Sequence, residues 1–113
     1  MDPLKSISQI AASGMLVQSA RLQVVAENVA NAETTGTSPG DDPYRRKTIS
    51  FEQYLDPETG LTMVRVGEVG RDDTPFTLRY EPSHPAADEN GVVKVSNVSP
   101  ILEMANMREA SLS

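Results

Sequence analysis

The N-terminal segment limits what this chain can fold into more than any other part of the sequence. From Pro3 to Ala30 it contains no proline after its first residue, and Asp2 stands where a helix N-cap is expected. Apolar residues recur along the segment at the spacing of one helix face. The segment therefore predicts a single helix about 42 Å long, at 1.5 Å per residue. That length exceeds the diameter of a 113-residue globule.

The apolar face of this helix follows a heptad phase. Burying its larger side chains is worth on the order of 10 kcal/mol, and a lone helix offers them no partner. The stripe must then pack either on this chain's own core or on another subunit, and the remaining sequence, with few large apolar residues, favours the second alternative. The apolar positions in this phase are Leu4, Ala11, Met15, Leu22, Val25 and Val29, and the polar ones are Ser8 and Gln18.

The middle of the chain has a different character. Seven of the eight prolines lie between Pro39 and Pro100, so no long helix fits there. Residues 32–43 are rich in Gly, Pro, Ser, Thr and Asp, which is typical of a loop or linker. A small antiparallel β unit is expected next, because several short segments alternate or carry β-branched residues between turn signals. Its candidate strands are residues 48–51, 61–69, 76–80 and 92–95.

The last segment predicts a second helix. Ser99 is a candidate N-cap, Pro100 suits the first helical position, and Glu103 lies near the positive end of the helix dipole. Ile101 and Met104 fall on one broad face. The expected fold class is thus α+β, with a long N-terminal and a short C-terminal helix flanking the β unit. The expected divisions are an N-terminal assembly helix (1–31), a loop (32–43), a small β domain (44–97) and the start of a C-terminal assembly helix (98–113).

Composition and motifs argue against most kinds of chemistry. A net charge of −6 disfavours nucleic-acid binding, and the absence of cysteine removes thiolate sites and disulfides. No apolar run is long enough for membrane insertion, and no cleaved secretion signal is expected. His84 is expected to be a loop residue that makes a hydrogen bond rather than a metal ligand. The basic run at residues 45–47 is expected to be a solvated strand edge. We expect neither catalysis nor a cofactor.

Four segments in order carry a family resemblance. Residues 21–34 contain Ala-x-Asn-Val-Ala-Asn-x-x-Thr, from Ala26 to Thr34, and resemble the N-terminal signature of flagellar basal-body rod and hook proteins. Residues 44–51 resemble the segment that follows the variable loop of that family. Residues 80–93 resemble a proximal-rod member, and residues 97–104 the start of its C-terminal helix.

The resemblance implies a self-assembling structural subunit of the proximal rod, located in the periplasm and exported by the flagellar export apparatus without a cleaved signal. Its partners would be other rod proteins and copies of itself. Asn28 and Asn31, which belong to the signature, would hydrogen bond at a packed subunit contact, although Asn31 could equally cap the helix. The family's C-terminal helix usually continues for several more turns, so we expect a truncated chain. The alternative function is a small β binding module whose amphipathic helix docks on a partner.

The residues expected to form the assembly interface come from both terminal segments. They are Leu4, Ala11, Met15, Leu22, Val25, Asn28, Val29, Asn31, Ile101 and Met104.

Overall fold

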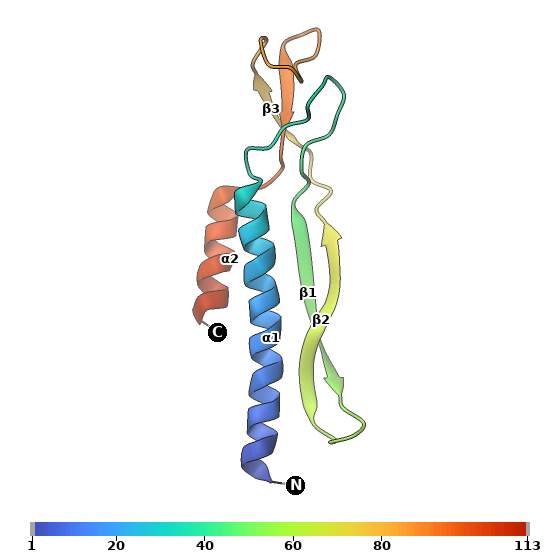
Figure 1. Ribbon diagram of the computed structural model, residues 1–113, viewed down its shortest axis with the longest axis vertical. Coiled ribbons are helices and arrows are strands. Elements are labelled where there is room, and N and C mark those ends of the chain that lie inside the picture. The colour runs from blue at the N-terminus through green and yellow to red at the C-terminus, as the bar shows by residue number, and fades with distance from the viewer. Residues whose placement is uncertain (1, 113) are drawn as a thin grey trace.

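The N-terminal helix sets the long axis of the molecule. In the computed structural model, which describes residues 2–112, α1 runs from Pro3 to Ala30 as expected. The carboxylate of Asp2 accepts a hydrogen bond of 3.0 Å from the Leu4 N–H, which confirms the predicted cap. The molecule measures 67 × 25 × 17 Å along its principal axes (Figure 1). Its radius of gyration is 19.4 Å, against about 13 Å for a globular chain of this length.

The β unit consists of two separate two-stranded antiparallel sheets. The longer sheet pairs β1 (Lys47–Leu55) with β2 (Thr62–Arg71), with a register shift between Ser50 and Phe51. The shorter sheet pairs β3 (Thr77–Tyr80) with β4 (Val92–Val95) and lies at one end of the molecule (Figure 1). The strand expected at residues 48–51 is longer than predicted, because β1 pairs with β2 over its whole length.

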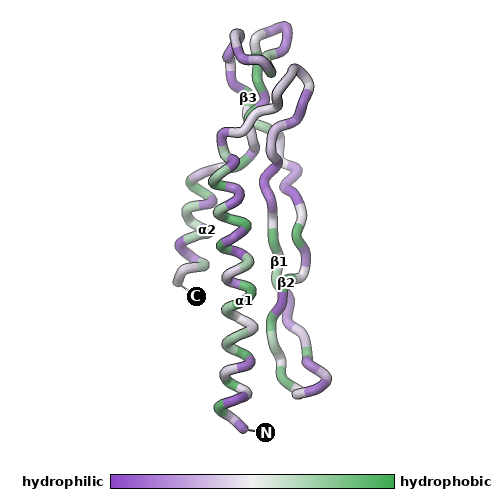
Figure 2. Tube along the Cα trace, viewed as in Figure 1, coloured by the Kyte–Doolittle hydropathy of each residue, from purple (hydrophilic) through white to green (hydrophobic). Residues whose placement is uncertain are grey.

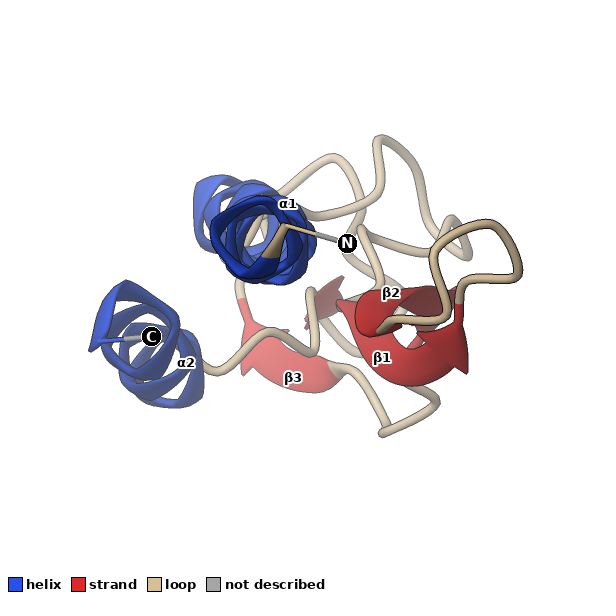
Figure 3. Ribbon diagram, turned by 90° about the horizontal axis from the view of Figure 1, so that it is seen from below, coloured by secondary structure: helices blue, strands red, loops and turns tan. Residues whose placement is uncertain are grey.

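The second helix returns alongside the first. Helix α2 (Pro100–Leu112) begins at the end of α1 nearest the short sheet and runs antiparallel to its C-terminal half (Figure 1). The Leu102 N–H donates to the hydroxyl of Ser99, the predicted N-cap, at 3.4 Å. The β1–β2 hairpin follows α1 on another side, as the view along the long axis makes clear (Figure 3). The predicted α+β class, with one long and one short helix, is confirmed.

The core is a thin seam rather than a central mass. On α1 the buried apolar side chains are Val17, Val24 and Val25, and near the short sheet they include Val93, Val95 and Val98. Polar and apolar residues alternate along the whole of α1 (Figure 2). Fifteen large hydrophobic side chains remain exposed among the described residues. Within residues 2–112, no helix is long and apolar enough to cross a membrane.

Candidate assembly surface

The predicted apolar stripe of α1 is only partly covered within the chain. Along its C-terminal half α2 lies on it, so that Val25 is buried and Leu22 is half-buried. Arg21 fixes α2 in place, since its guanidinium donates to the side chains of Asn106 at 3.3 Å and Glu109 at 3.1 Å. The C-terminal half of the stripe thus packs on the chain itself, whereas no element among residues 2–112 covers Leu4 and Met15 in the other half.

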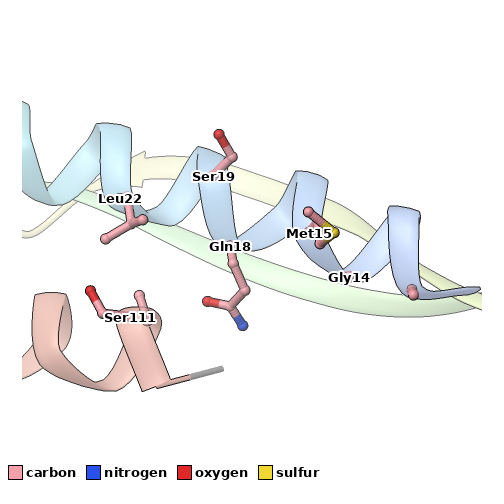
Figure 4. A pocket seen from close by; sticks show the side chains of 8 residues that line it. Gly14, Met15, Gln18, Ser19, Leu22 and Ser111 are labelled. Carbon is pink, nitrogen blue, oxygen red and sulfur yellow. The ribbon is translucent and has the colours of Figure 1, made fainter.

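The uncovered half of the stripe continues directly from the seat of α2. Leu4 is 75% exposed, Met15 is 72% exposed, and Ala11 between them is also exposed. An open groove of about 580 Å³ lies along this half, and the last turn of α2 closes one end of it (Figure 4). The groove lies in line with α2, whose residues Ala110 and Ser111 form its end. Its lining residues are Ala11, Gly14, Met15, Gln18, Ser19, Leu22, Ala110 and Ser111.

A second apolar surface lies on the outer side of α2. Glu103 and Ala110 are buried on the side of the helix that faces α1. By helical periodicity Ile101 lies on the opposite side and Met104 on the flank between the two, and both are exposed. Val29, at the end of α1, is exposed as well. These three predicted residues are therefore available at the surface of the subunit.

The two signature asparagines have different surroundings. Asn28 is fully buried, and its amide joins the end of α1 to the start of β1. Its Nδ2 donates to the Lys47 carbonyl at 2.9 Å, and its Oδ1 accepts from the Lys47 N–H at 2.8 Å and the Tyr44 hydroxyl at 2.6 Å. Asn31 is the C-cap of α1, and its amide donates to the Glu27 carbonyl at 2.9 Å.

These contacts account for both asparagines within one chain. Asn28 has satisfied both ends of its amide inside the subunit, and Val25 is likewise interior. The capping alternative for Asn31 is realised in the structure. A role of these three residues in subunit contacts stays a prediction.

The basic run is not the solvated strand edge that the sequence favoured; that prediction is wrong. Arg46 is largely buried, and its guanidinium bonds to the fully buried carboxylate of Glu103 and lies 3.3 Å from a carboxylate oxygen of Asp72. Lys47 pairs with Glu27 at 2.6 Å. The Arg45 guanidinium stacks 4.2 Å from the centre of the Phe76 ring. The side chains of Arg45, Arg46 and Lys47 therefore all make contacts within the chain, because the start of β1 lies at a junction of several elements.

The charges at this junction stabilise one another. Burial alone would lower the pKa of Arg46, but its bonds to Glu103 and Asp72 raise that pKa above its ordinary value. Hydrogen bonds from Thr74, together with the charge of Arg46, hold the pKa of Asp72 below its usual range. The cluster ties the first turn of α2 to the start of β1 and the end of β2. We call Arg46, Asp72 and Glu103 the ion cluster.

Sequence reasoning missed the ion cluster because its members are far apart along the chain, by 26 and 57 positions from Arg46. The sequence indicated Ile101 and Met104 as the apolar face of this helix, whereas the face buried in the structure is that of Glu103 and Ala110. A carboxylate on such a face needs a cationic partner.

The single histidine has the role that the sequence predicted. His84 is half-buried in a loop, and its Nδ1 accepts a hydrogen bond from the Ala86 N–H at 2.9 Å. Its Nε2 lies 3.3 Å from the Thr35 hydroxyl. In the described part of the chain, no three His, Cys, Asp or Glu side chains gather as metal ligands would.

Comparisons with known proteins converge on one family. A family model described as "Flagella basal body rod protein" matches residues 9–36, most of α1 and the two signature asparagines. The flagellar basal-body rod protein FlgC of Agrobacterium fabrum is 53% identical over 113 residues, covering all of this chain and 81% of that protein. FlgC of Salmonella typhimurium is 42% identical, covering 97% and 81%. FlgC of Borreliella burgdorferi is 34% identical, covering 96% and 82%.

Proposed function

Because this chain belongs to the flagellar basal-body rod protein family as a relative of FlgC, we propose that its uncovered apolar stripe is the surface by which it assembles into the rod. The chain is a structural subunit of the basal body and not an enzyme, and it assembles with other rod components. The alternative of a small binding module is not favoured by this membership.

The observation that carries the proposal is the exposure of large apolar side chains on α1. Leu4 and Met15 belong to the same stripe as the residues that α2 covers; both are exposed, and Met15 lines an open groove. Exposed apolar side chains of this size gain about 1.5–3 kcal/mol each when a partner covers them. A helix of a neighbouring subunit can supply that cover, with the outer surface of α2, including Ile101 and Met104, as a second contact.

Contacts of this kind give a helical array when they are repeated. The groove on α1 and the outer side of α2 are different surfaces, so a contact between them is heterologous and does not close on itself. Copies of this chain and other rod proteins are the proposed neighbours. Rotation applied at one end would pass through packed helices, whose side chains interdigitate and resist sliding. We propose torque transmission as the mechanical role.

The route and the place of assembly follow from the same proposal. A rod subunit has to reach the periplasm, and the flagellar export apparatus is the proposed carrier. The proximal rod in the periplasm is the proposed location.

A charge placed in the uncovered stripe tests the proposal. Met15→Asp changes a side chain that is 72% exposed, so the subunit should keep its far-UV circular dichroism and its urea midpoint. Expressed in a cell whose own copy is deleted, the variant should fail to restore swimming, because a buried unpaired carboxylate opposes helix packing.

The matched control places the same charge away from the helices. Leu55→Asp alters a residue of similar exposure at the far end of β1, and we expect it to restore swimming. Normal swimming with Met15→Asp would remove the stripe from assembly. Loss of swimming with both variants would mean that added charge anywhere is harmful, and the argument from the stripe would fail as well.

A further inference from the structure

The short sheet has two very different faces. On one face Val93 and Val95 are buried, and Val95 forms a bridge with Thr35 in the loop that follows α1. On the other face Leu78 is 66% exposed and Tyr80 is 72% exposed. Both belong to β3, at the end of the molecule away from the N-terminus (Figure 1). Tyrosine is one of the residue types that most often anchor protein interfaces.

The backbone of β3 is also free along one edge. Within residues 2–112, β3 pairs with β4 alone. The Glu81 N–H donates to the Gly91 carbonyl at 2.9 Å, next to the Tyr80–Val92 pair. Hydrogen-bonded pairs alternate along an antiparallel ladder, so the N–H and C=O groups of Leu78 and Tyr80 point away from β4. Such an edge is a template for another strand.

A depression on the exposed face of the sheet, between Leu78 of β3 and the loops on the outer side of β4, combines apolar walls with carboxylates. It has a volume of about 380 Å³. Its walls include Leu78, Ala86 and Val92, and its rim includes Asp41 and Asp88. The Lys94 ammonium at the same rim is already paired with Asp42 at 3.3 Å. An aliphatic stem with a cationic head fits such a site, since the walls take the methylene groups and the rim takes the charge.

The charge of this end of the molecule points to the same kind of partner. Residues 35–42 and 76–96, which make up the short sheet and its loops, contain five acidic and two basic residues. Hydrogen bonds from Ser38 and Thr37 hold the pKa of Asp41 below its ordinary value, so this carboxylate is ionised near neutral pH. A second copy of the chain, with its net charge of −6, would bring like charge to an acidic end.

We propose that the free edge of β3 adds a strand from a different rod protein, in which apolar residues alternate with lysine or arginine. Backbone hydrogen bonds to Leu78 and Tyr80 supply affinity. A lysine or arginine side chain of the added strand passes over Leu78 and reaches the carboxylates of the depression, which selects for the cation. The Tyr80 ring offers the same cation a second contact through its face. Only the origin of the strand in another rod subunit rests on the proposed function, whereas the strand site itself does not.

A peptide titration followed by NMR tests the proposal on the ¹⁵N-labelled chain. The probe is an eight-residue peptide in which valine alternates with lysine, and its matched control has glutamate for lysine. The amide signals of Leu78 and Tyr80 should shift, and their hydrogen exchange should slow, with the lysine peptide. Its affinity should exceed that of the glutamate peptide at least tenfold at low salt, and this ratio should shrink at high salt.

Variants of Leu78 distinguish backbone pairing from nonspecific hydrophobic binding. Leu78→Pro removes an N–H that the ladder does not use and should abolish the effect at Tyr80. Leu78→Thr keeps that N–H and should only weaken binding. Unchanged Val93 and Val95 signals would show that the sheet is intact. If Leu78→Pro disturbs these signals, the test rests on two measurements on the unmodified chain. These are the slowed hydrogen exchange of Leu78 and Tyr80 and the preference for the lysine peptide over the glutamate peptide.

Three results would overturn the strand site: equal affinity for both peptides, no binding of either, or shifts confined to other residues. Each is distinguishable from failure of the proposed function. If the lysine peptide fails but Met15→Asp still abolishes swimming, assembly through the helices stands and the strand site does not. If the peptide binds while Met15→Asp swims normally, the reverse holds.

Discussion

The pair formed by Arg46 and Glu103 allows a quantitative prediction. Glu103 is fully buried, and among the described residues its Oε2 has no hydrogen-bond partner, so Arg46 is the main compensation for its charge. Arg46→Met keeps much of the side-chain volume and removes the cation. The carboxylate is then left without a counter-charge in an apolar environment.

The expected magnitude follows from that burial. Removing one partner of a buried ion pair costs about 3–5 kcal/mol. The contact of Arg46 with Asp72 is partly exposed and adds at most about 1 kcal/mol. Because small domains unfold with only about 5–15 kcal/mol, the variant should lose a large part of its stability. Replacing both partners, in Arg46→Met with Glu103→Leu, should restore most of it, since apolar residues then fill the same space.

Urea unfolding at pH 7, followed by circular dichroism at 222 nm, measures these differences. The matched control is Arg65→Met, which breaks a pair with Glu52 whose side chains are 57% and 49% exposed. That variant should change the free energy of unfolding by about 1 kcal/mol or less. The reasoning is refuted if Arg46→Met costs no more than Arg65→Met. It is also refuted if the double variant costs the sum of its two single changes.

Two further predictions concern the same junction. Asn28→Ala leaves the N–H and C=O of Lys47 without their partner and should lower the free energy of unfolding by about 2–3 kcal/mol. Tyr44→Phe loses a single hydrogen bond to the Asn28 amide and should lower it by about 1 kcal/mol. Equal costs for the two variants would contradict this ranking. The lowered pKa of Asp72 gives stability that is present above its unfolded value of about 3.9 and is lost as pH falls through the lower folded value. A series of urea midpoints between neutral and acid pH should therefore fall less steeply for Asp72→Asn than for the unmodified chain.

Local signals in the sequence determined the helices well. Asp2, Pro3 and the recurring apolar residues of the heptad phase were enough to predict the bounds of α1, and Ser99 with Pro100 to predict the start of α2. The capping residues act within one turn of the helix, so they can be recognised in a short window of sequence. The same holds for His84, whose bond to the Ala86 N–H spans two positions.

Features that depend on contacts between residues far apart in the sequence could not be predicted in this way. The end of β1 at Leu55 is set by pairing with Thr62, and the division into two sheets is set by which strands meet. Arg46 was assigned to a solvated edge because neither Glu103 nor Asp72 is near it in sequence. The family signature indicated that Asn28 is a functional residue. Its buried hydrogen bonds to Lys47 could be seen only in the folded structure.

The antiparallel return of α2 brings the two ends of the segment between the helices close together. Helix α1 ends and α2 begins at the same level of the molecule, so everything between Ala30 and Pro100 is inserted between two adjacent helix ends (Figure 1). The helix pair is closed by its own contacts, such as those of Arg21. A loop of the inserted segment, for example the turn at Gly40, can thus be lengthened while the pair of helices keeps its geometry.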